Sequence, residues 1–206
     1  MNTQSKDWNQ LYLNNITPWN YDIFSAEIEK RYQEWQLNPQ KYSRVLDVGC
    51  GTGTNAIEFA RRGFQVTGCD IAEYAIRQAK EKSQRAKVEV QWLQADFFKY
   101  DWTLAPFPLI IDRGCYHILR QLDINRYLSV MDQLTHTGSL FIVLTGSTNY
   151  NQEIGPPKVS AEEMCRELGQ LFHLKDLREF CFEDAICEGV EISPLGWSAV
   201  WEKPQS

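Results

Sequence analysis

A short apolar segment that runs directly into closely spaced glycines constrains the fold of this chain most strongly. Residues 45–53 read Val-Leu-Asp-Val-Gly-Cys-Gly-Thr-Gly, and a helical pattern begins near Thr54. Glycines let the backbone approach a ligand that a Cβ would exclude, and the first turn of a helix presents free N–H groups. The pattern predicts a strand, a tight turn and a helix that form a nucleotide-type cofactor site, with Asp47 at the strand end.

The spacing of the glycines argues against two common phosphate-binding sites. A dinucleotide fingerprint, G-x-G-x-x-G, counted from Gly49 would need a third glycine where Thr54 stands. A phosphate loop would need Gly-Lys-Ser/Thr, and no lysine follows until Lys80. The expected cofactor therefore need not carry phosphate.

Two further strand candidates also end in acidic residues. The segment 64–69 is followed by Asp70, and the segment 88–93 is followed by Gln94-Ala95-Asp96-Phe97. An acidic side chain at the end of the second strand can accept hydrogen bonds from both hydroxyls of a ribose, as in dinucleotide-binding folds. Three acids at three strand ends predict one binding constellation.

The motif Asp47-Val-Gly-Cys-Gly-Thr-Gly53 resembles the first motif of the class I S-adenosylmethionine-dependent methyltransferases. The resemblance implies S-adenosyl-L-methionine as cofactor and S-adenosyl-L-homocysteine as product. It also implies that Asp96 accepts a hydrogen bond from the adenine amine, and that Phe97 or its backbone lies against the ring. The expected cofactor-binding residues are Trp19, Asp47, Gly49, Cys50, Gly51, Gly53, Asp70, Ile71, Asp96, Phe97 and Arg113.

The rest of the chain alternates between strand and helix patterns. Apolar positions three and four residues apart predict helices through 72–79 and 124–131, and Ser160 with Glu163 forms a capping-box pattern that opens another. The resemblance implies an α/β, Rossmann-like, open seven-stranded and mostly parallel sheet, with its last strand antiparallel and helices on both faces. The expected strands lie near 45–48, 64–69, 88–93, 109–112, 140–144, 174–182 and 197–201.

Composition favours one globular unit that acts on a small molecule. The chain has 206 residues, of which 43% are hydrophobic, and no linker is apparent, so we expect a single domain over 1–206. The net charge of −6 and the placement of the densest basic stretch at a helix end disfavour nucleic acid. The N-terminus lacks a signal peptide, and no apolar run is long enough to span a membrane. We therefore expect a cytoplasmic monomer with a small-molecule substrate and neither nucleic-acid nor membrane partners.

The six cysteines show neither a C-x-x-C pair nor metal-ligand spacing with the three histidines. We therefore expect no metal site and no disulfide. Cys50, Cys69 and Cys181 lie in or beside apolar strands, which predicts that they are small buried side chains.

The N-terminal segment 1–40 is rich in aromatic residues. Trp8, Tyr12 and Trp19 precede a helix pattern, and their spacing resembles the family pattern W-x-x-x-Y followed by P-W-D/N. Such residues either pack in the core or form a lid over the cofactor, where aromatic faces attract a sulfonium cation and exclude water. We expect Trp19 to belong to a lid.

The segment after the fourth strand, Asp112-Arg-Gly-Cys-Tyr-His-Ile-Leu119, is expected beside the transferred methyl group. It lacks the Asn/Asp-Pro-Pro-aromatic motif of nitrogen methyltransferases and resembles the thiopurine, thiol and halide methyltransferase group. The candidate catalytic residues are Arg113, Tyr116 and His117. Arg113 either pairs with Asp112 or caps neighbouring carbonyls, or it lines the donor or acceptor pocket. Tyr116 either stacks on the acceptor or fills a gap, and His117 acts as a base, orients the acceptor or is structural.

Methyl transfer is an in-line displacement, so the enzyme mainly aligns nucleophile, carbon and sulfur. A free thiol ionises at about pH 8.5 and is a strong nucleophile, so it needs little more than positioning and a nearby cation such as Arg113. The first interpretation is therefore methyl transfer to a thiol or another soft nucleophile. The alternatives are an O- or N-methyltransferase of a small metabolite, a chalcogen or halide methyltransferase, and a non-catalytic nucleoside-binding protein on the same fold.

Overall fold

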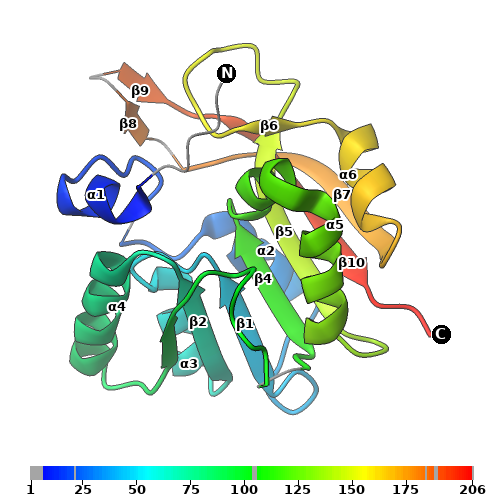
Figure 1. The fold of residues 1–206 in the computed structure, drawn as a ribbon, viewed down its shortest axis with the longest axis horizontal. Coiled ribbons are helices and arrows are strands. Elements are labelled where there is room, and N and C mark those ends of the chain that lie inside the picture. Colours follow the sequence, from blue (N-terminus) through cyan, green and yellow to red (C-terminus); the bar gives the residue numbers. More distant parts are fainter. Residues whose placement is uncertain (1–6, 21, 104–105, 184, 188–189, 206) are drawn as a thin grey trace.

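The computed structural model describes residues 7–20, 22–103, 106–183, 185–187 and 190–205 (Figure 1). Residues 1–6, over which the sequence predicts no signal peptide, lie outside the described part. The helices are α1 (Trp8–Leu13), α2 (Ala26–Glu34), α3 (Thr54–Arg61), α4 (Glu73–Ala86), α5 (Tyr116–Leu134) and α6 (Ala161–Leu168). The strands are β1 (Arg44–Val48), β2 (Gln65–Asp70), β3 (Gln91–Gln94), β4 (Leu109–Arg113), β5 (Leu140–Ser147), β6 (Lys158–Val159), β7 (His173–Cys181), β8 (Ala185–Cys187), β9 (Val190–Ile192) and β10 (Leu195–Glu202).

The main sheet has the strand order β3-β2-β1-β4-β5-β10-β7, and β6 pairs with β5. Strands β1 to β5 are parallel, whereas β10 runs antiparallel to both β5 and β7. The expected Rossmann-like sheet with an antiparallel last strand is confirmed. The chain moves outward from β1 to β3 and then returns to β4 beside β1, so a crevice forms where these two strands end.

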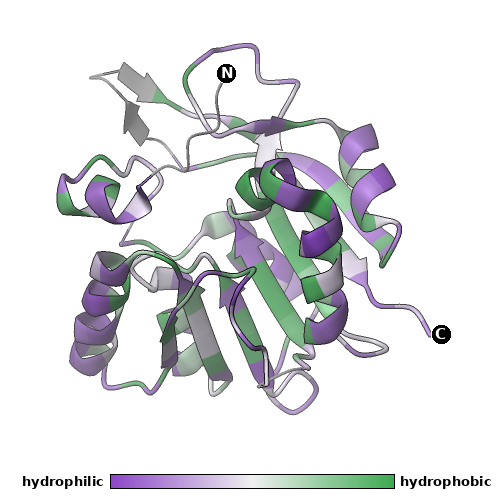
Figure 2. Ribbon diagram, viewed as in Figure 1, coloured by the Kyte–Doolittle hydropathy of each residue, from purple (hydrophilic) through white to green (hydrophobic). Residues whose placement is uncertain are grey.

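Helices cover both faces of the sheet (Figure 1). Val45 packs in the core cluster that contains Phe59 of α3, whereas the next residue, Leu46, packs in the cluster that contains Tyr127 of α5. This alternation follows from the two-residue period of a strand. Figure 2 shows β4 as hydrophobic along most of its length and hydrophilic at its carboxyl end, where the crevice lies.

The structure differs from the sequence-based expectation at several strands. The third strand begins at Gln91 rather than Val88, because α4 ends with Lys87 in the left-handed conformation and the Val88 N–H bonds back to Ser83. Strands β6, β8 and β9 were not predicted, since two or three residues carry no periodic signal. Cys181 was expected to be buried but is exposed, because β7 is the edge strand of the sheet.

The capping box was predicted correctly, because Ser160 and Glu163 bond reciprocally at the start of α6. No helix in the described ranges is long and apolar enough to cross a membrane.

A buried arginine joins α2 to the far edge of the sheet. Arg31 is 1% exposed and donates hydrogen bonds to the side chain and the carbonyl of Ser198, each at 2.7 Å. It also pairs with Asp176 of β7 and lies 3.4 Å from Glu27. A guanidinium suits this place because its five N–H groups can bond several acceptors at once.

We predict that Arg31→Ala lowers the free energy of unfolding by about 3–5 kcal/mol, because it leaves buried acceptors without their cationic partner. Equilibrium urea unfolding, followed by circular dichroism, measures the loss. Lys30→Ala is the matched control, since Lys30 is 66% exposed and also approaches Glu27, so its loss should stay below about 1 kcal/mol. Equal losses in the two variants would contradict a structural role for the buried arginine.

Candidate functional site

The glycine turn between β1 and α3 adopts a conformation that favours glycine at three positions. Gly49, Gly51 and Gly53 have φ values of +63°, +54° and +82°. A Cβ on Gly49 would lie 2.8 Å from the Cys115 side chain, and one on Gly51 would lie 2.7 Å from the Tyr12 hydroxyl. A Cβ on Gly53 would collide with the Trp92 ring. The sequence predicted close approach of a ligand, whereas in this structure protein side chains approach all three glycines.

Asp47, the last residue but one of β1, lies beneath the turn and lines a cavity there. Its side chain is buried, and its Oδ2 atom has no hydrogen-bond partner among the described residues. Burial raises the pKa of Asp47 to about 8, and the neighbouring Asp112 adds to the rise, while the Ala56 N–H and Arg113 oppose it. A buried carboxyl oxygen that faces a cavity without a partner is suited to a ligand that donates a hydrogen bond or carries positive charge.

Asp70 ends β2 and connects this strand to the glycine turn. Its Oδ2 accepts a hydrogen bond from the Gly51 N–H at 2.9 Å, and its Oδ1 accepts one from the Ala72 N–H at 2.8 Å. Burial raises the pKa of this carboxyl, although the two N–H groups oppose the rise. Ile71, which follows it, is one of the exposed large apolar side chains.

Asp96 and Phe97 follow β3, as expected, but they do not both face the crevice. Asp96 accepts a hydrogen bond from the Phe98 N–H at 2.9 Å and pairs with Lys99 at 3.0 Å. The Phe97 ring is buried and stacks on Tyr127 at a centroid distance of 5.7 Å. The place of the ring in the core favours the second alternative, that the backbone of Phe97 and not its ring lies against a ligand.

Of the two alternatives for Tyr116, stacking on the acceptor and filling a gap, its burial favours the second. Its side chain is fully buried at the start of α5, where its hydroxyl donates to Glu167 at 2.7 Å. Asp112 orients this helix start by accepting from the N–H groups of Cys115 and Tyr116 at 2.7 and 3.0 Å. Tyr116 fills a gap between α5 and α6 and lies away from the crevice.

His117 is 5% exposed, and its Nδ1 lies 3.2 Å from the Thr145 hydroxyl of β5. Its ring lies close to Gly114, because a Cβ there would come within 3.4 Å of the imidazole. The histidine is therefore held below the turn that follows β4 and does not line the cavity.

Arg113 ends β4 and does line the cavity. Its guanidinium pairs with Glu183 at 2.5 Å and donates to the Trp19 carbonyl at 3.2 Å. The arginine therefore faces the pocket and bonds to a carbonyl, but its acidic partner is Glu183 and not the expected Asp112. Glu183 was missed, because 70 residues separate it from Arg113 and no local pattern marks it.

The N-terminal segment packs against the glycine turn, where the Tyr12 hydroxyl approaches Gly51. The Trp19 indole donates to the Tyr12 hydroxyl at 3.3 Å, and its ring meets that of Trp8 edge-on at 5.6 Å. Asn9 of α1 accepts from the Tyr74 N–H of α4 at 2.8 Å. We call residues 8–20 and 22–24 the lid; Trp19 lies in it, and its role over a cofactor stays a prediction.

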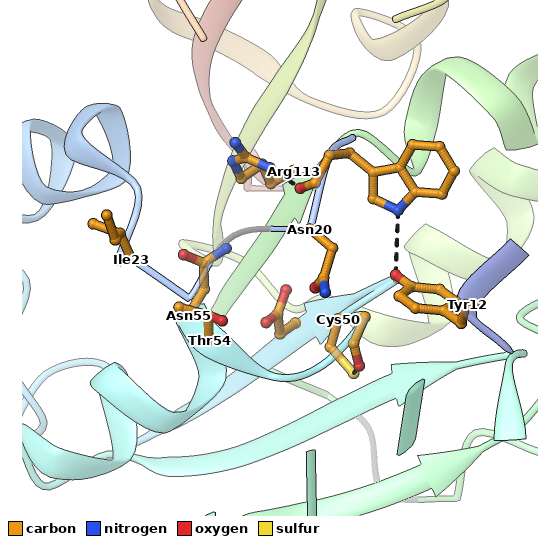
Figure 3. A pocket seen from close by; sticks show the side chains of 11 residues that line it. Tyr12, Asn20, Ile23, Cys50, Thr54, Asn55 and Arg113 are labelled. Carbon is orange, nitrogen blue, oxygen red and sulfur yellow. Dashed lines mark hydrogen bonds between the residues drawn. The ribbon is translucent and has the colours of Figure 1, made fainter. Parts of the chain in front are cut away.

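The lid and the strand ends enclose a cavity of about 50 Å³ (Figure 3). Pockets that hold ligands of cofactor size usually measure about 300–1,000 Å³, so this cavity can hold only part of such a ligand. The lining residues are Tyr12, Trp19, Asn20, Ile23, Asp47, Gly49, Cys50, Gly51, Thr54, Asn55 and Arg113.

Comparison with known proteins agrees with this geometry. The family model described as "Methyltransferase domain" matches residues 45–138. An uncharacterized methyltransferase of Schizosaccharomyces pombe, C750.03c, is 33% identical over 109 residues, which cover 52% of this chain and 75% of that protein.

Two solved structures share the fold. A SAM-dependent methyltransferase from Methanosarcina mazei superimposes with a TM-score of 0.71 at 16% identity, covering 89% of this chain and 100% of that one. Another, from Anabaena variabilis, gives a TM-score of 0.70 at 16% identity, covering 95% and 93%. Because the matched sequence contains the glycine turn and the strands that meet at the crevice, the chain belongs to the class I S-adenosylmethionine-dependent methyltransferases.

Proposed function

We propose that this methyltransferase moves the methyl group of S-adenosyl-L-methionine to a small-molecule thiol or another soft nucleophile. When bound, the donor supplies a methyl carbon that is activated by a positively charged sulfur.

The donor assignment rests on the three strand ends. The partnerless oxygen of Asp47 suits the ammonium of the donor's amino-acid end. Asp70 lies at the end of β2, where a carboxylate binds a ribose diol, and Asp96 with the backbone of Phe97 lies at the next strand end for the adenine. Trp19, beside Tyr12 in the lid, offers an aromatic face to a sulfonium cation. The turn residues Gly49, Cys50, Gly51 and Gly53, with Ile71, complete the proposed donor site.

The thiol assignment rests on one observation. Among the described residues that line the cavity, none is suited to remove a proton from an acceptor. Four of them are ionisable: Tyr12, Asp47, Cys50 and Arg113. Burial raises the pKa values of Tyr12 and Cys50 above their usual range, and Asp47 is assigned to the donor. An acceptor that arrives already ionised needs no base, and thiols lose their proton more readily than phenols or protonated amines do. Arg113 then supplies the cation that stabilises a thiolate.

We predict that Asp70→Asn weakens binding of S-adenosyl-L-homocysteine by about 1.5–3 kcal/mol, because a charge-assisted hydrogen bond to the ribose is lost. The asparagine keeps one oxygen for the Gly51 or Ala72 N–H, so the turn is disturbed less than by alanine. Isothermal titration calorimetry measures the affinity, and circular dichroism checks the fold. Unchanged affinity in a folded variant would overturn the assignment of Asp70 to the ribose.

We predict that the affinity for S-adenosyl-L-homocysteine rises with pH until about pH 8 and then levels off. With its pKa of about 8, Asp47 is mostly protonated at neutral pH, and an ammonium binds the ionised form, so binding expels the proton. Asp112, Asp70 and Arg113 are the charged groups that act on it. Calorimetry in buffers of different ionisation enthalpy should count about one proton released near pH 7. Asp47→Asn should remove the slope, and a slope that survives this change would contradict the prediction.

We predict that His117→Ala lowers turnover of an aromatic thiol by less than about tenfold, because no proton has to be removed and the imidazole is held by Thr145. Loss of a general base typically costs about 10²–10⁴-fold, so steady-state kinetics across pH separates the two cases. His136→Ala controls for loss of an imidazole, since His136 lies in the turn before β5. Efficient methylation of a phenol or amine that collapses in His117→Ala, without any thiol turnover, would refute the thiol proposal.

A further inference from the structure

Two amide side chains that face the cavity have their orientation fixed by hydrogen bonds. Lys82 of α4 donates to the Thr52 hydroxyl at 2.7 Å, and Thr52 in turn lies 2.7 Å from the Asn20 Oδ1. An ammonium can only donate, so the hydroxyl uses its own hydrogen on Asn20. The atom that receives it has to be the amide oxygen, so the NH₂ group of Asn20, a residue that lines the cavity, is left as a donor.

Asn55, in the first turn of α3, is oriented in the same way. Its Oδ1 accepts from the Ser25 backbone N–H at 3.4 Å, and a backbone N–H can bond only to the oxygen of an amide. Its NH₂ group therefore also remains as a donor. Neither Asn20 nor Asn55 donates from its amide nitrogen to any acceptor within the described ranges.

Arg113 lies on the same cavity as the two amides, and Figure 3 shows the three side chains around one space. Its place is set by Glu183 and by the Trp19 carbonyl. The cavity thus has an acidic side at Asp47 and a side that offers N–H donors and a guanidinium. Such a surface suits a negatively charged group, because each N–H can make a charge-assisted hydrogen bond.

We propose that Asn20, Asn55 and Arg113 form a subsite for one anionic group. The inference rests on the proposed function, since two anions would be present during that reaction. One is the carboxylate at the amino-acid end of the donor, whose ammonium is assigned to Asp47 across the cavity. The other is the thiolate of the acceptor.

The test uses substitutions that keep each oxygen contact and remove the donor. In Asn55→Asp the side chain still accepts from the Ser25 N–H, and a carboxylate in the first turn of α3 also favours the helix. In Asn20→Asp the side chain still accepts from Thr52, with Lys82 nearby. Asn38→Asp is the matched control, because its Oδ1 likewise accepts a backbone N–H, from Lys41 at 3.0 Å, away from the cavity.

The first arm compares two nucleosides by calorimetry. S-adenosyl-L-homocysteine carries the amino-acid end, whereas 5′-methylthioadenosine has the same adenine, sugar and sulfur without it. If the donor carboxylate occupies the subsite, Asn20→Asp and Asn55→Asp weaken the first ligand about 10- to 100-fold and leave the second within about twofold. Asn38→Asp leaves both unchanged.

The second arm titrates 4-nitrothiophenolate and its neutral S-methyl ether into the protein saturated with S-adenosyl-L-homocysteine. If the acceptor anion occupies the subsite, the two variants weaken the thiolate by about tenfold or more, and binding of the thioether and of both nucleosides stays unchanged. An equal loss for thiolate and thioether would point to a general distortion and contradict the subsite.

Unchanged binding of every ligand in both variants overturns the subsite while leaving the proposed function intact. Failure of the wild-type protein to bind either nucleoside overturns the proposed function instead. In that case the thiolate and the thioether are titrated into the free protein. Tighter binding of the thiolate that both variants abolish would still support the subsite. Equal affinity for thiolate and thioether in the wild-type protein would overturn it.

Discussion

The hydrogen bond from the Gly51 N–H to the Asp70 carboxylate holds the site together, because it joins the turn after β1 to the end of β2. The strand ladder continues into this turn, since the Cys50 N–H bonds to the Cys69 carbonyl at 3.0 Å. The acids at the ends of neighbouring strands are thereby fixed relative to one another before any ligand arrives. Such preorganisation lowers the conformational entropy that the protein loses when a ligand binds.

The same strand ends bring several acidic side chains close together, and these side chains differ in how many hydrogen bonds they receive. Asp112 is fully buried beside Asp47, but two N–H groups at the start of α5 satisfy one of its oxygens. Burial still raises the pKa of Asp112 to about 7. Asp47 keeps one oxygen without a described partner, so its desolvation is compensated only when a donor group enters the cavity. The least satisfied acid is thus the one that lines the cavity.

The sheet, the strand ends and the capping box could be predicted because each is encoded locally. The glycine turn, Asp70 and the Ser160–Glu163 pair depend on neighbours within a few residues or on the order of parallel strands. Tyr116 and Phe97 could not be assigned from sequence, since an aromatic side chain after a strand faces a ligand or the core depending on packing from distant elements.

The donors that line the cavity escaped sequence analysis for a related reason. Asn20 belongs to the Pro-Trp-Asn motif of residues 18–20, yet its amide is oriented by Thr52 and by Lys82, which is 62 residues away in a helix. Glu183 reaches Arg113 from the segment after β7. A sequence pattern reports which side chains are available, whereas the direction of a donor depends on contacts between segments that are far apart in the chain.

The crevice is built from two parts that differ in how they are held. The lower part consists of strand ends within a continuous parallel ladder, whereas the lid is attached by separate contacts such as Asn9 to Tyr74 and Trp19 to Arg113. A substitution in the lid therefore leaves the ladder undisturbed. The walls of the cavity can therefore be altered from the lid side without a change in the spacing of the strand ends below.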